Sequence, residues 1–547
     1  MTEHPEGTHV GTQGESPAAA PGTIGFRNGL RARWRGLPHA QRIGIAIGLQ
    51  ILLAILLFFV DNSLGYAVLT ISALYWIHRL PPLPWKLGAQ SLLVLIFLVA
   101  GPASLGILLA VAFAVLWVPE KPRTWVLPIV VTLAAVLYPF YQPKMFTIPV
   151  FGVWPDVATG VVMLIFIMMA LGLNIVVGYA GLLDLGYVAF YATGAYTAAF
   201  FASQQFAGQK CPKPGFDVNN CPVAAVPKHN FDFGAVGLVP GAGGVHISVW
   251  ALLAIAGMVT AFFGIVIGLP TLRLRGDYLA IVTLGFGEIL PQIARNGDNL
   301  FGTGINLTNG PNGITPLDSM GFGNGISHAT AGFLPASFLT CCKASYFGHQ
   351  VQSTDVFFWV AILLLLFTVF CSLRLQYSRL GRAWIAIRED ETAAAAMGIP
   401  LMRTKTWAYA SGAFFGGVAG AYYAVFRSAT FPGDFFFNIS VFILCMVILG
   451  GMGNVWGVIV GAAFLSYLDR EGLANTGAWL NENIQIGSWH PKFEVPLYAS
   501  GIYGVIIVLV MLFRPEGLIP SKRRAAEFHE GVHDEPLYDV QHAGAEG

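Results

Sequence analysis

Charged residues are scarce in this chain. Only 11% of its 547 residues are Asp, Glu, Lys or Arg, whereas hydrophobic residues make up 55%. A soluble domain carries about 25% charged residues, so the shortage excludes an ordinary globular protein. The formal net charge of +1 gives no reason to expect a nucleic-acid partner.

Signatures of catalysis and nucleotide binding are also lacking. The sequence contains no Gly-x-x-x-x-Gly-Lys-Ser/Thr run, so the chain has no P-loop of its own. It has no Gly-x-Ser-x-Gly nucleophile motif, and its 12 histidines are scattered, mostly in tails and polar loops. We therefore expect no catalytic residue, no cofactor and no metal site in this chain.

Cysteine is rare as well, with six residues in the whole chain. Cys211 and Cys221 lie in one long polar loop, and a disulfide between them is favoured only if that loop faces an oxidising compartment. Two free thiols remain the alternative. Cys371 and Cys445 fall within apolar runs, where packing is the expected role.

What the chain has in abundance is long apolar runs. They predict an all-α polytopic membrane protein of roughly 12–14 transmembrane helices, some of them broken by glycine. Four parts are expected: a disordered cytoplasmic tail (1–40), an N-terminal transmembrane extension (41–145), a core (150–520) and a cytoplasmic C-terminal tail (521–547).

The distribution of Lys and Arg predicts the orientation, because positive residues stay on the cytoplasmic side. Five arginines precede the first apolar run, and alternation of the spans places the later basic clusters on the same side. The bacterial inner membrane, with both termini in the cytoplasm, is the expected location. The long polar loops 203–246, 292–355 and 469–494 are then outside.

A polar island stands out on the cytoplasmic side. It runs from Tyr377 to Pro400 and contains an alanine-rich segment that predicts a short helix ending at Gly398. Basic and acidic side chains cluster just before this helix. Acidic residues near a helix N-terminus are favoured by the helix dipole, but an exposed helix on this face also suits a soluble partner. The residues proposed for docking are Gly381, Arg382, Arg388, Glu389, Asp390, Glu391 and Gly398.

Polar residues within apolar segments are candidates for the substrate path. Asn174 and Asp184 lie in a glycine-rich stretch that predicts an interrupted helix, although Asp184 could also be solvated at the interface. Thr283 and Glu288 lie in the apolar run 277–290. An ionisable group there is expensive and usually faces a cavity or a partner. Pro291, however, predicts that the helix ends soon after Glu288, which would place the carboxylate at the outer interface.

Glycines spaced four apart mark a later segment. Gly412, Gly416 and Gly420 form a small-residue row of the kind that lets helices approach closely. Packing within the chain is the favoured interpretation, and a seam with another subunit is the alternative.

Together these segments resemble the larger permease subunit of bacterial ABC importers for branched-chain amino acids. The resemblance covers most of residues 157–520 and is carried by segments in the same order along the chain: 171–196, 272–289, 309–314, 381–398, 431–463 and 503–518. Asn309 replaces the first of two glycines that the family usually has before Pro-Asn-Gly, and the loop 203–246 is expanded.

The resemblance implies a set of partners and a mechanism. The chain would pair with a second permease in the lipid bilayer, two cytoplasmic ATPase subunits would grip the polar island, and a periplasmic binding protein would deliver leucine, isoleucine or valine. Two alternatives remain open at this point. One is an ABC permease for urea, short amides or another small polar solute, and the other is an ion-coupled secondary transporter.

Overall fold

The computed structural model describes most of the apolar chain. The described residues are 39–58, 61–79, 85–99, 102–148, 150–203, 231–233, 245–274, 277–298, 306–320, 345–346, 349–350, 352–483, 494–514 and 516–519. The structure divides into two compact units, Met1–Gly106 and Ile107–Gly547, which are described separately. The expected tails and both Cys211 and Cys221 lie outside the described residues.

The first unit is helical. Its helices are α2 (His39–Phe58), α3 (Asn62–Arg79), α4 (Trp85–Val99) and the start of α5 (Ala103–Trp117). Helices α2 and α3 pack together, and the Trp76 indole nitrogen donates a hydrogen bond to the Gln50 side-chain oxygen at 2.8 Å. Large apolar side chains on the outside of these helices, such as Leu49 and Ile71, are exposed. That pattern is expected where the solvent is lipid.

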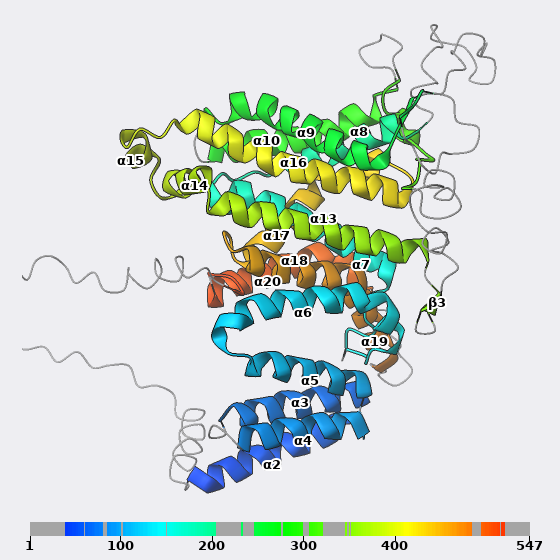
Figure 1. The fold of residues 1–547 in the computed structure, drawn as a ribbon, viewed down its shortest axis with the longest axis vertical. Helices are drawn as coiled ribbons and strands as arrows, with labels where there is room; N and C mark the ends of the chain where they lie inside the picture. The colour runs from blue at the N-terminus through cyan, green and yellow to red at the C-terminus, as the bar shows by residue number, and fades with distance from the viewer. Residues whose placement is uncertain are drawn as a thin grey trace, which may run out of the picture. The chain divides into compact units, whose positions relative to one another are not determined.

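The second unit is a helical bundle, to which Figure 1 gives the labels. After α5, its longer elements are α6 (Glu120–Tyr141), α7 (Val157–Leu173), α8 (Val188–Phe201), α9 (Val249–Thr271), α10 (Asp277–Arg295), α13 (Ser353–Gln376), α14 (Arg379–Glu389), α15 (Glu391–Ala396), α16 (Leu401–Arg427), α17 (Phe437–Gly450), α18 (Val455–Tyr467), α19 (Leu473–Asn483) and α20 (Ala499–Phe513).

Short elements complete the second unit. Two π-helical turns, η2 (Asn174–Tyr179) and η8 (Leu468–Gly472), continue α7 and α18, and 3-10 turns are η1 (Gln142–Lys144), η6 (Gly310–Asn312), η7 (Pro432–Asp434) and η9 (Val495–Tyr498). Strands β1 (Phe231–Phe233) and β2 (Val245–Ile247) pair in parallel, and β3 (Ser345–Tyr346) and β4 (His349–Gln350) pair antiparallel.

Several of these helices suit a membrane. Within the described residues, six helical segments are long and apolar enough to span a bilayer: Val126–Lys144, Val157–Tyr179, Val249–Thr271, Ser353–Gln376, Pro432–Gly450 and Val495–Phe513. Four shorter apolar helices accompany them. The all-α polytopic class is therefore confirmed, while the number of crossings and the domain boundaries stay predictions.

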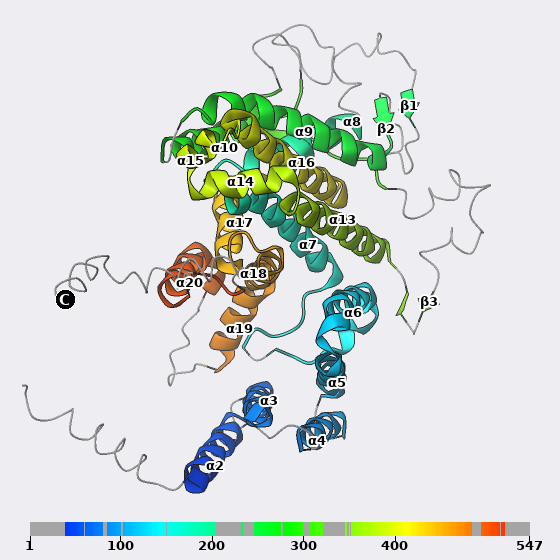
Figure 2. The ribbon, with the colours of Figure 1, turned by 60° about the vertical axis from the view of Figure 1, so that its left-hand side comes forward.

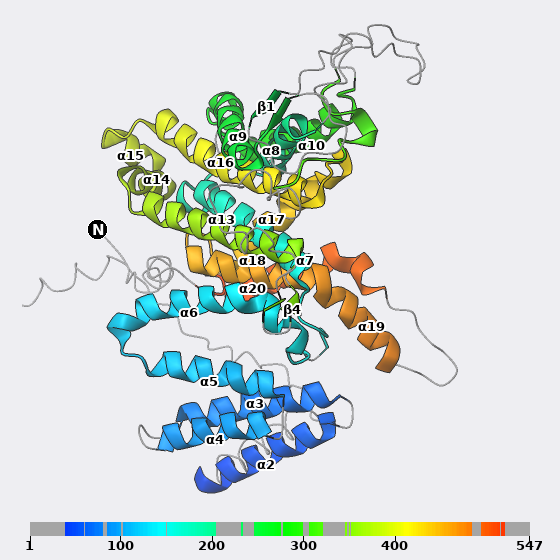
Figure 3. The same ribbon diagram turned by 45° about the vertical axis from the view of Figure 1, so that its right-hand side comes forward.

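Helix α7 lies at the centre of the second unit. It packs against α13, α16, α17 and α18, and all three ribbon views place it among them (Figures 1, 2 and 3). Its N-terminus is capped by Asp156, whose carboxylate accepts a hydrogen bond from the Thr159 backbone at 2.7 Å. Nearly every side chain from Val161 to Val176 is buried. A helix that is apolar on all faces is expected in such a position.

Helix α16 packs through its glycines. A Cβ atom added at Gly412 would meet α7, one at Gly416 would approach Tyr187, and one at Gly420 would lie 2.0 Å from the carbonyl oxygen of Tyr191. The row therefore faces α7 and α8 of the same chain. Close backbone approach through small residues replaces the hydrophobic effect as the cause of helix association in lipid.

Two expectations about helix ends were wrong. Pro291 does not end α10, which continues to Arg295 and places Glu288 in its interior. Proline is tolerated there because neighbouring groups can satisfy the freed backbone in a membrane bundle. The loop expected at 469–494 is also partly helical, because α18 continues through η8 into α19 (Figure 3).

We predict that Gly420→Ala lowers the free energy of unfolding by about 1–3 kcal/mol, the usual cost of overpacking. The added methyl group would collide with the Tyr191 carbonyl of α8. The matched control is Gly504→Ala in α20, where nothing lies within 4 Å of the new Cβ. Thermal unfolding of the two purified variants in detergent measures the difference. Equal stability of both variants would contradict this packing.

Candidate functional site

Helix α14 is held against the bundle by one face. Its apolar residues Gly381, Trp384 and Ile387 are spaced three apart and buried, as expected for an amphipathic surface helix. The Trp384 indole donates a hydrogen bond to the Thr404 carbonyl oxygen at 2.8 Å, which fixes α14 to α16. The Ser378 hydroxyl caps the helix by accepting from the Gly381 backbone at 3.1 Å.

Helix α15 is the short alanine-rich helix that the sequence predicts. Asp390 is its N-cap, and its carboxylate accepts hydrogen bonds from the backbones of Thr392 at 2.7 Å and Ala393 at 3.0 Å. Hydrogen bonds from the Thr392 hydroxyl and these two backbone groups lower the pKa of Asp390. The cap thus supports α15 above the usual carboxyl pKa and is lost as the pH falls through the lowered value.

Glu391 is paired within the chain. Its carboxylate lies 2.8 Å from the Lys405 ammonium of α16, with exposed fractions of 35% for the Glu391 side chain and 6% for that of Lys405. Unpaired, the buried lysine would be costly. Asp390 and Glu391 therefore have structural partners of their own. The sequence analysis treated them chiefly as docking residues, because the contact between Glu391 and Lys405 depends on the fold.

The exposed part of α15 is small and apolar. Thr392, Ala393, Ala395 and Ala396 are exposed, and the Met397 side chain that follows is 84% exposed. In Figure 1, α15 projects from one end of the second unit, whereas β3 lies at the opposite end. We call α14, α15 and Met397–Pro400 the knob.

Asp184 lies in the connection between η2 and α8. It is 1% exposed, so the alternative of a solvated side chain is wrong. One carboxylate oxygen accepts a hydrogen bond from the Gly186 backbone at 2.9 Å, and the other has no hydrogen-bond partner among the described residues. Burial raises the pKa of Asp184 to about 7. Burial thus favours the neutral, protonated form of this carboxyl group.

Thr283 of α10 contacts the same connection. Its hydroxyl accepts a hydrogen bond from the Leu185 backbone at 3.1 Å, one residue beyond Asp184. A Cβ added at Gly186 would collide with the Thr283 carbonyl oxygen, so α10 lies directly on this connection. Two of the four residues proposed for the path are thus neighbours.

Glu288 is on the exposed side of α10. Gln292 and Arg295 follow it at helical spacing and are exposed as well, which gives a polar stripe on an otherwise apolar helix. A charged side chain in the interior of a membrane helix rarely faces lipid. This face is expected to meet water, substrate or another protein.

Asn174 starts the π-turn η2 and is fully buried. Its side-chain oxygen accepts a hydrogen bond from the Gly453 backbone at 2.8 Å, across 279 residues of sequence. The residue therefore joins the end of α7 to the turn between α17 and α18. The broken helix that the glycines predict takes the form of a π-turn followed by non-helical chain.

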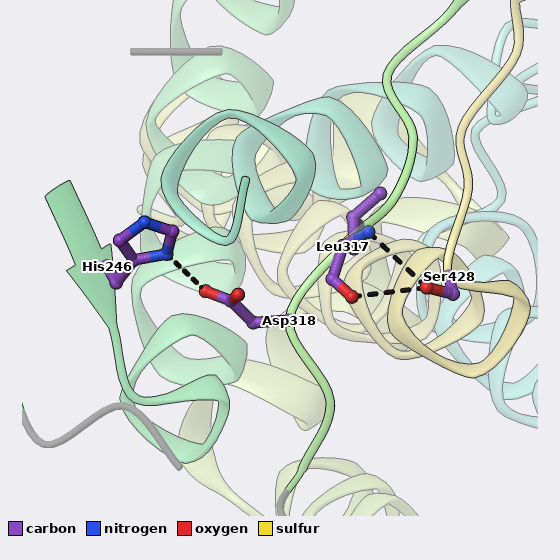
Figure 4. A network of polar contacts seen from close by, with 4 residues as sticks. All are labelled: His246, Leu317, Asp318 and Ser428. Atoms are coloured by element: carbon purple, nitrogen blue, oxygen red, sulfur yellow. Dashed lines mark hydrogen bonds and ion pairs between the residues drawn. The ribbon is translucent and has the colours of Figure 1, made fainter. Parts of the chain in front are cut away.

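A polar network at the other end of the bundle fixes the segment 306–320. His246 of β2 and Asp318, which are 1% and 0% exposed, approach to 2.6 Å (Figure 4). Nearby, the Ser428 hydroxyl donates to the Leu317 carbonyl oxygen and accepts from the Leu317 backbone. The sequence interpretation assigned His246 no role. A lone histidine in a loop gave no signal that it would be buried.

No group of three or more potential metal ligands occurs among the described residues. The sequence does contain one His-Glu-x-x-His run, His529–His533, in the polar C-terminal tail. This spacing matches the zinc-binding motif of metalloproteases when it lies on a helix. The run falls outside the described residues.

Comparisons with known proteins identify relatives of this chain. A family model described as the permease component of the branched-chain amino acid transport system matches residues 157–511. The high-affinity branched-chain amino acid transport system permease protein LivM of Salmonella typhimurium is 35% identical over 380 residues, which are 69% of this chain and 72% of that protein.

Two further relatives carry similar names. The Escherichia coli LivM protein of the same description is 34% identical over 69% of this chain and 72% of its own length. A probable branched-chain amino acid transport permease protein LivM of Methanocaldococcus jannaschii is 27% identical over 50% of this chain and 69% of its own. No solved structure matches.

We predict that Glu391→Gln destabilises the chain by about 1–3 kcal/mol, because it leaves the Lys405 charge buried without its partner. The double variant Glu391→Gln with Lys405→Met removes both charges and should recover most of this loss. Thermal unfolding of wild type, both single variants and the double variant completes the cycle. Strictly additive effects would show that the pair contributes nothing.

Proposed function

The chain belongs to the family of branched-chain amino acid transport permeases, and we propose that it forms, with a second permease, the membrane path of an ATP-driven importer of leucine, isoleucine and valine. The observation that carries the proposal is the family match over residues 157–511, which includes the whole bundle from α7 to most of α20. The match also includes the knob.

The chain itself supplies no ATP chemistry in this proposal. Two ATPase subunits bind the knob, and their closure on ATP moves the permease. The exposed alanines of α15 and the Met397 side chain offer a compact apolar surface that fits a shallow groove. An exposed methionine adapts its shape to such a groove, which suits an anchor at an interface.

We assign the knob to the cytoplasm of a bacterium and the segment 306–320 to the periplasmic side of its inner membrane. The arginines and lysines around the knob support this orientation through the positive-inside rule. The placement of α15 and β3 at opposite ends of the second unit agrees with it (Figure 1). A periplasmic binding protein would then deliver the amino acid to the end that contains the His246–Asp318 pair.

The polar stripe on α10 is our candidate for the substrate path. A branched-chain amino acid is a zwitterion with an apolar side chain, so its path needs few polar groups among apolar ones. Glu288 can accept hydrogen bonds from the substrate ammonium group. The flanking Ile281 and Leu284 side chains, which are 64% and 36% exposed, offer apolar contact on the same side of α10. The second permease would close the path over this face.

We predict that Met397→Glu weakens binding of the ATPase subunits by roughly tenfold or more, since a central apolar anchor is replaced by a charge. Co-purification of the ATPases with the permease measures this effect. The matched control is Leu497→Glu in η9, a side chain that is 75% exposed and remote in sequence from the knob. Undiminished recovery with Met397→Glu would refute docking through this surface.

We predict that Glu288→Gln lowers leucine uptake by roughly tenfold, because the amide oxygen can still accept from the substrate ammonium group but no longer carries the charge that strengthens the hydrogen bond. The amide keeps the size of the side chain, so recovery of the ATPases and the second permease should stay normal. Glu482→Gln, an exposed carboxylate of α19, is the control. Wild-type uptake rate and affinity in the Glu288→Gln variant, at matched expression, would remove Glu288 from the path.

A further inference from the structure

The end of α7 leaves backbone oxygen atoms inside the protein. The helix passes into the π-turn η2, and beyond Tyr179 the chain stops being helical. The last carbonyl groups of a helix have no intrahelical partner, and inside a membrane bundle there is little water to replace one. The carbonyl oxygens of Ile175 and Val176 accept hydrogen bonds from the backbone nitrogens of Ala180 and Leu182. Gly178 needs a donor from elsewhere.

The donor comes from the knob. The Arg388 guanidinium, in the last turn of α14, donates a hydrogen bond to the Gly178 carbonyl oxygen at 2.6 Å, across 210 residues of sequence. A cation at this position also interacts favourably with the negative end of the helix dipole. Gly181 has φ +69°, and a Cβ there would lie 2.7 Å from the Arg388 side chain. The glycine thus allows the close approach.

The same guanidinium lies against the turn between α17 and α18. A Cβ at Gly453, which has φ +87°, would lie 3.3 Å from the terminal nitrogen of Arg388. Two other helical elements bind Gly453. Its backbone nitrogen donates a hydrogen bond to the Asn174 side chain of η2 at 2.8 Å, and its carbonyl oxygen accepts one from the Gln376 side-chain amide of α13 at 3.4 Å. One arginine of the knob therefore meets a junction of α7, α13, α17 and α18.

We propose that Arg388 is the positioning residue that transmits movement of the knob to the end of α7 and to the α17–α18 turn. The inference rests on the proposed docking of ATPase subunits on the knob. Arg388 stands two residues before Asp390, the N-cap of α15, so a force on α15 reaches it through a very short piece of chain. Its planar, multiply donating group holds a fixed geometry that a single amine does not.

This role replaces the docking role that the sequence suggested for Arg388, because its guanidinium points into the bundle toward Gly178. It also differs from the contacts that merely fix the knob in place. Trp384 binds α14 to α16, and Lys405 binds α15 to α16. Arg388 instead connects α14 to the π-turn of the central helix and to the turn after α17. Losing it should leave the ATPases docked and able to hydrolyse ATP, while less of that hydrolysis moves substrate.

The test uses the complete importer in proteoliposomes, with leucine transported per ATP hydrolysed as the readout. Arg388→Gln should lower this ratio by about fivefold or more, a typical coupling effect, while ATPase co-purification stays at the wild-type level. Arg388→Lys keeps the charge but offers a less rigid donor, and should give an intermediate ratio. The control is Arg374→Gln, an exposed arginine near the end of α13, which should match wild type.

The outcomes are distinguishable. If the wild-type complex shows no ATP-dependent uptake, the proposed function fails first. If wild type transports and Arg388→Gln has the wild-type ratio, the proposal for Arg388 is overturned while the proposed function stands. Should the Gln variant fail to assemble, the Lys variant decides by the same ratio. Loss of assembly in both would also overturn the proposal, because Arg388 would then be a folding residue.

Discussion

Every backbone polar group inside a membrane bundle must find a partner without help from water. In this protein the constraint acts most strongly where helices are interrupted. The π-turn at the end of α7 satisfies part of its backbone internally and receives a hydrogen bond from Arg388 at the Gly178 carbonyl oxygen. Asn174 and Gln376 hold Gly453 in the next broken connection. From the connection between η2 and α8, the Tyr187 hydroxyl donates to the Gly412 carbonyl oxygen of α16 at 2.9 Å. The interruptions are therefore the places where distant parts of the chain are joined.

The contacts within the knob likewise decide which of its residues are left for a partner. Its buried face is fixed by Trp384, and its two acidic residues at the start of α15 are occupied by a cap and an ion pair. Beyond these residues, the exposed side of α15 is a small, mostly apolar surface ending in Met397. Docking and transmission are thus assigned to different residues of one short segment. The α15 surface that would bind the ATPases and Arg388, which contacts the end of α7, are separated by the helix cap Asp390.

The sequence predicted the class of protein and the position of the knob, because both depend on local composition. Long apolar runs indicate membrane helices wherever they pack, and acidic residues before an alanine run indicate the start of a short helix. It could not predict contacts across hundreds of residues, such as those of Asn174 or Arg388. It failed at Pro291, where a local rule against proline in helices was overridden by the bundle. It left open whether Asp184 is solvated, because the burial of this residue depends on packing with α10. Packing of Gly412, Gly416 and Gly420 was the favoured interpretation of their spacing, and their neighbours became visible only in the structure.

We propose that ATP hydrolysis by docked subunits, and not an ion gradient, drives a branched-chain amino acid through the membrane path. The direct measurement is uptake of labelled leucine by proteoliposomes that contain the chain, a second permease, the ATPases and the binding protein. Uptake should require ATP on the side of the membrane where the ATPases are bound. It should persist when ionophores collapse all ion gradients. Uptake that continues without ATP and disappears with the ionophores would contradict the account.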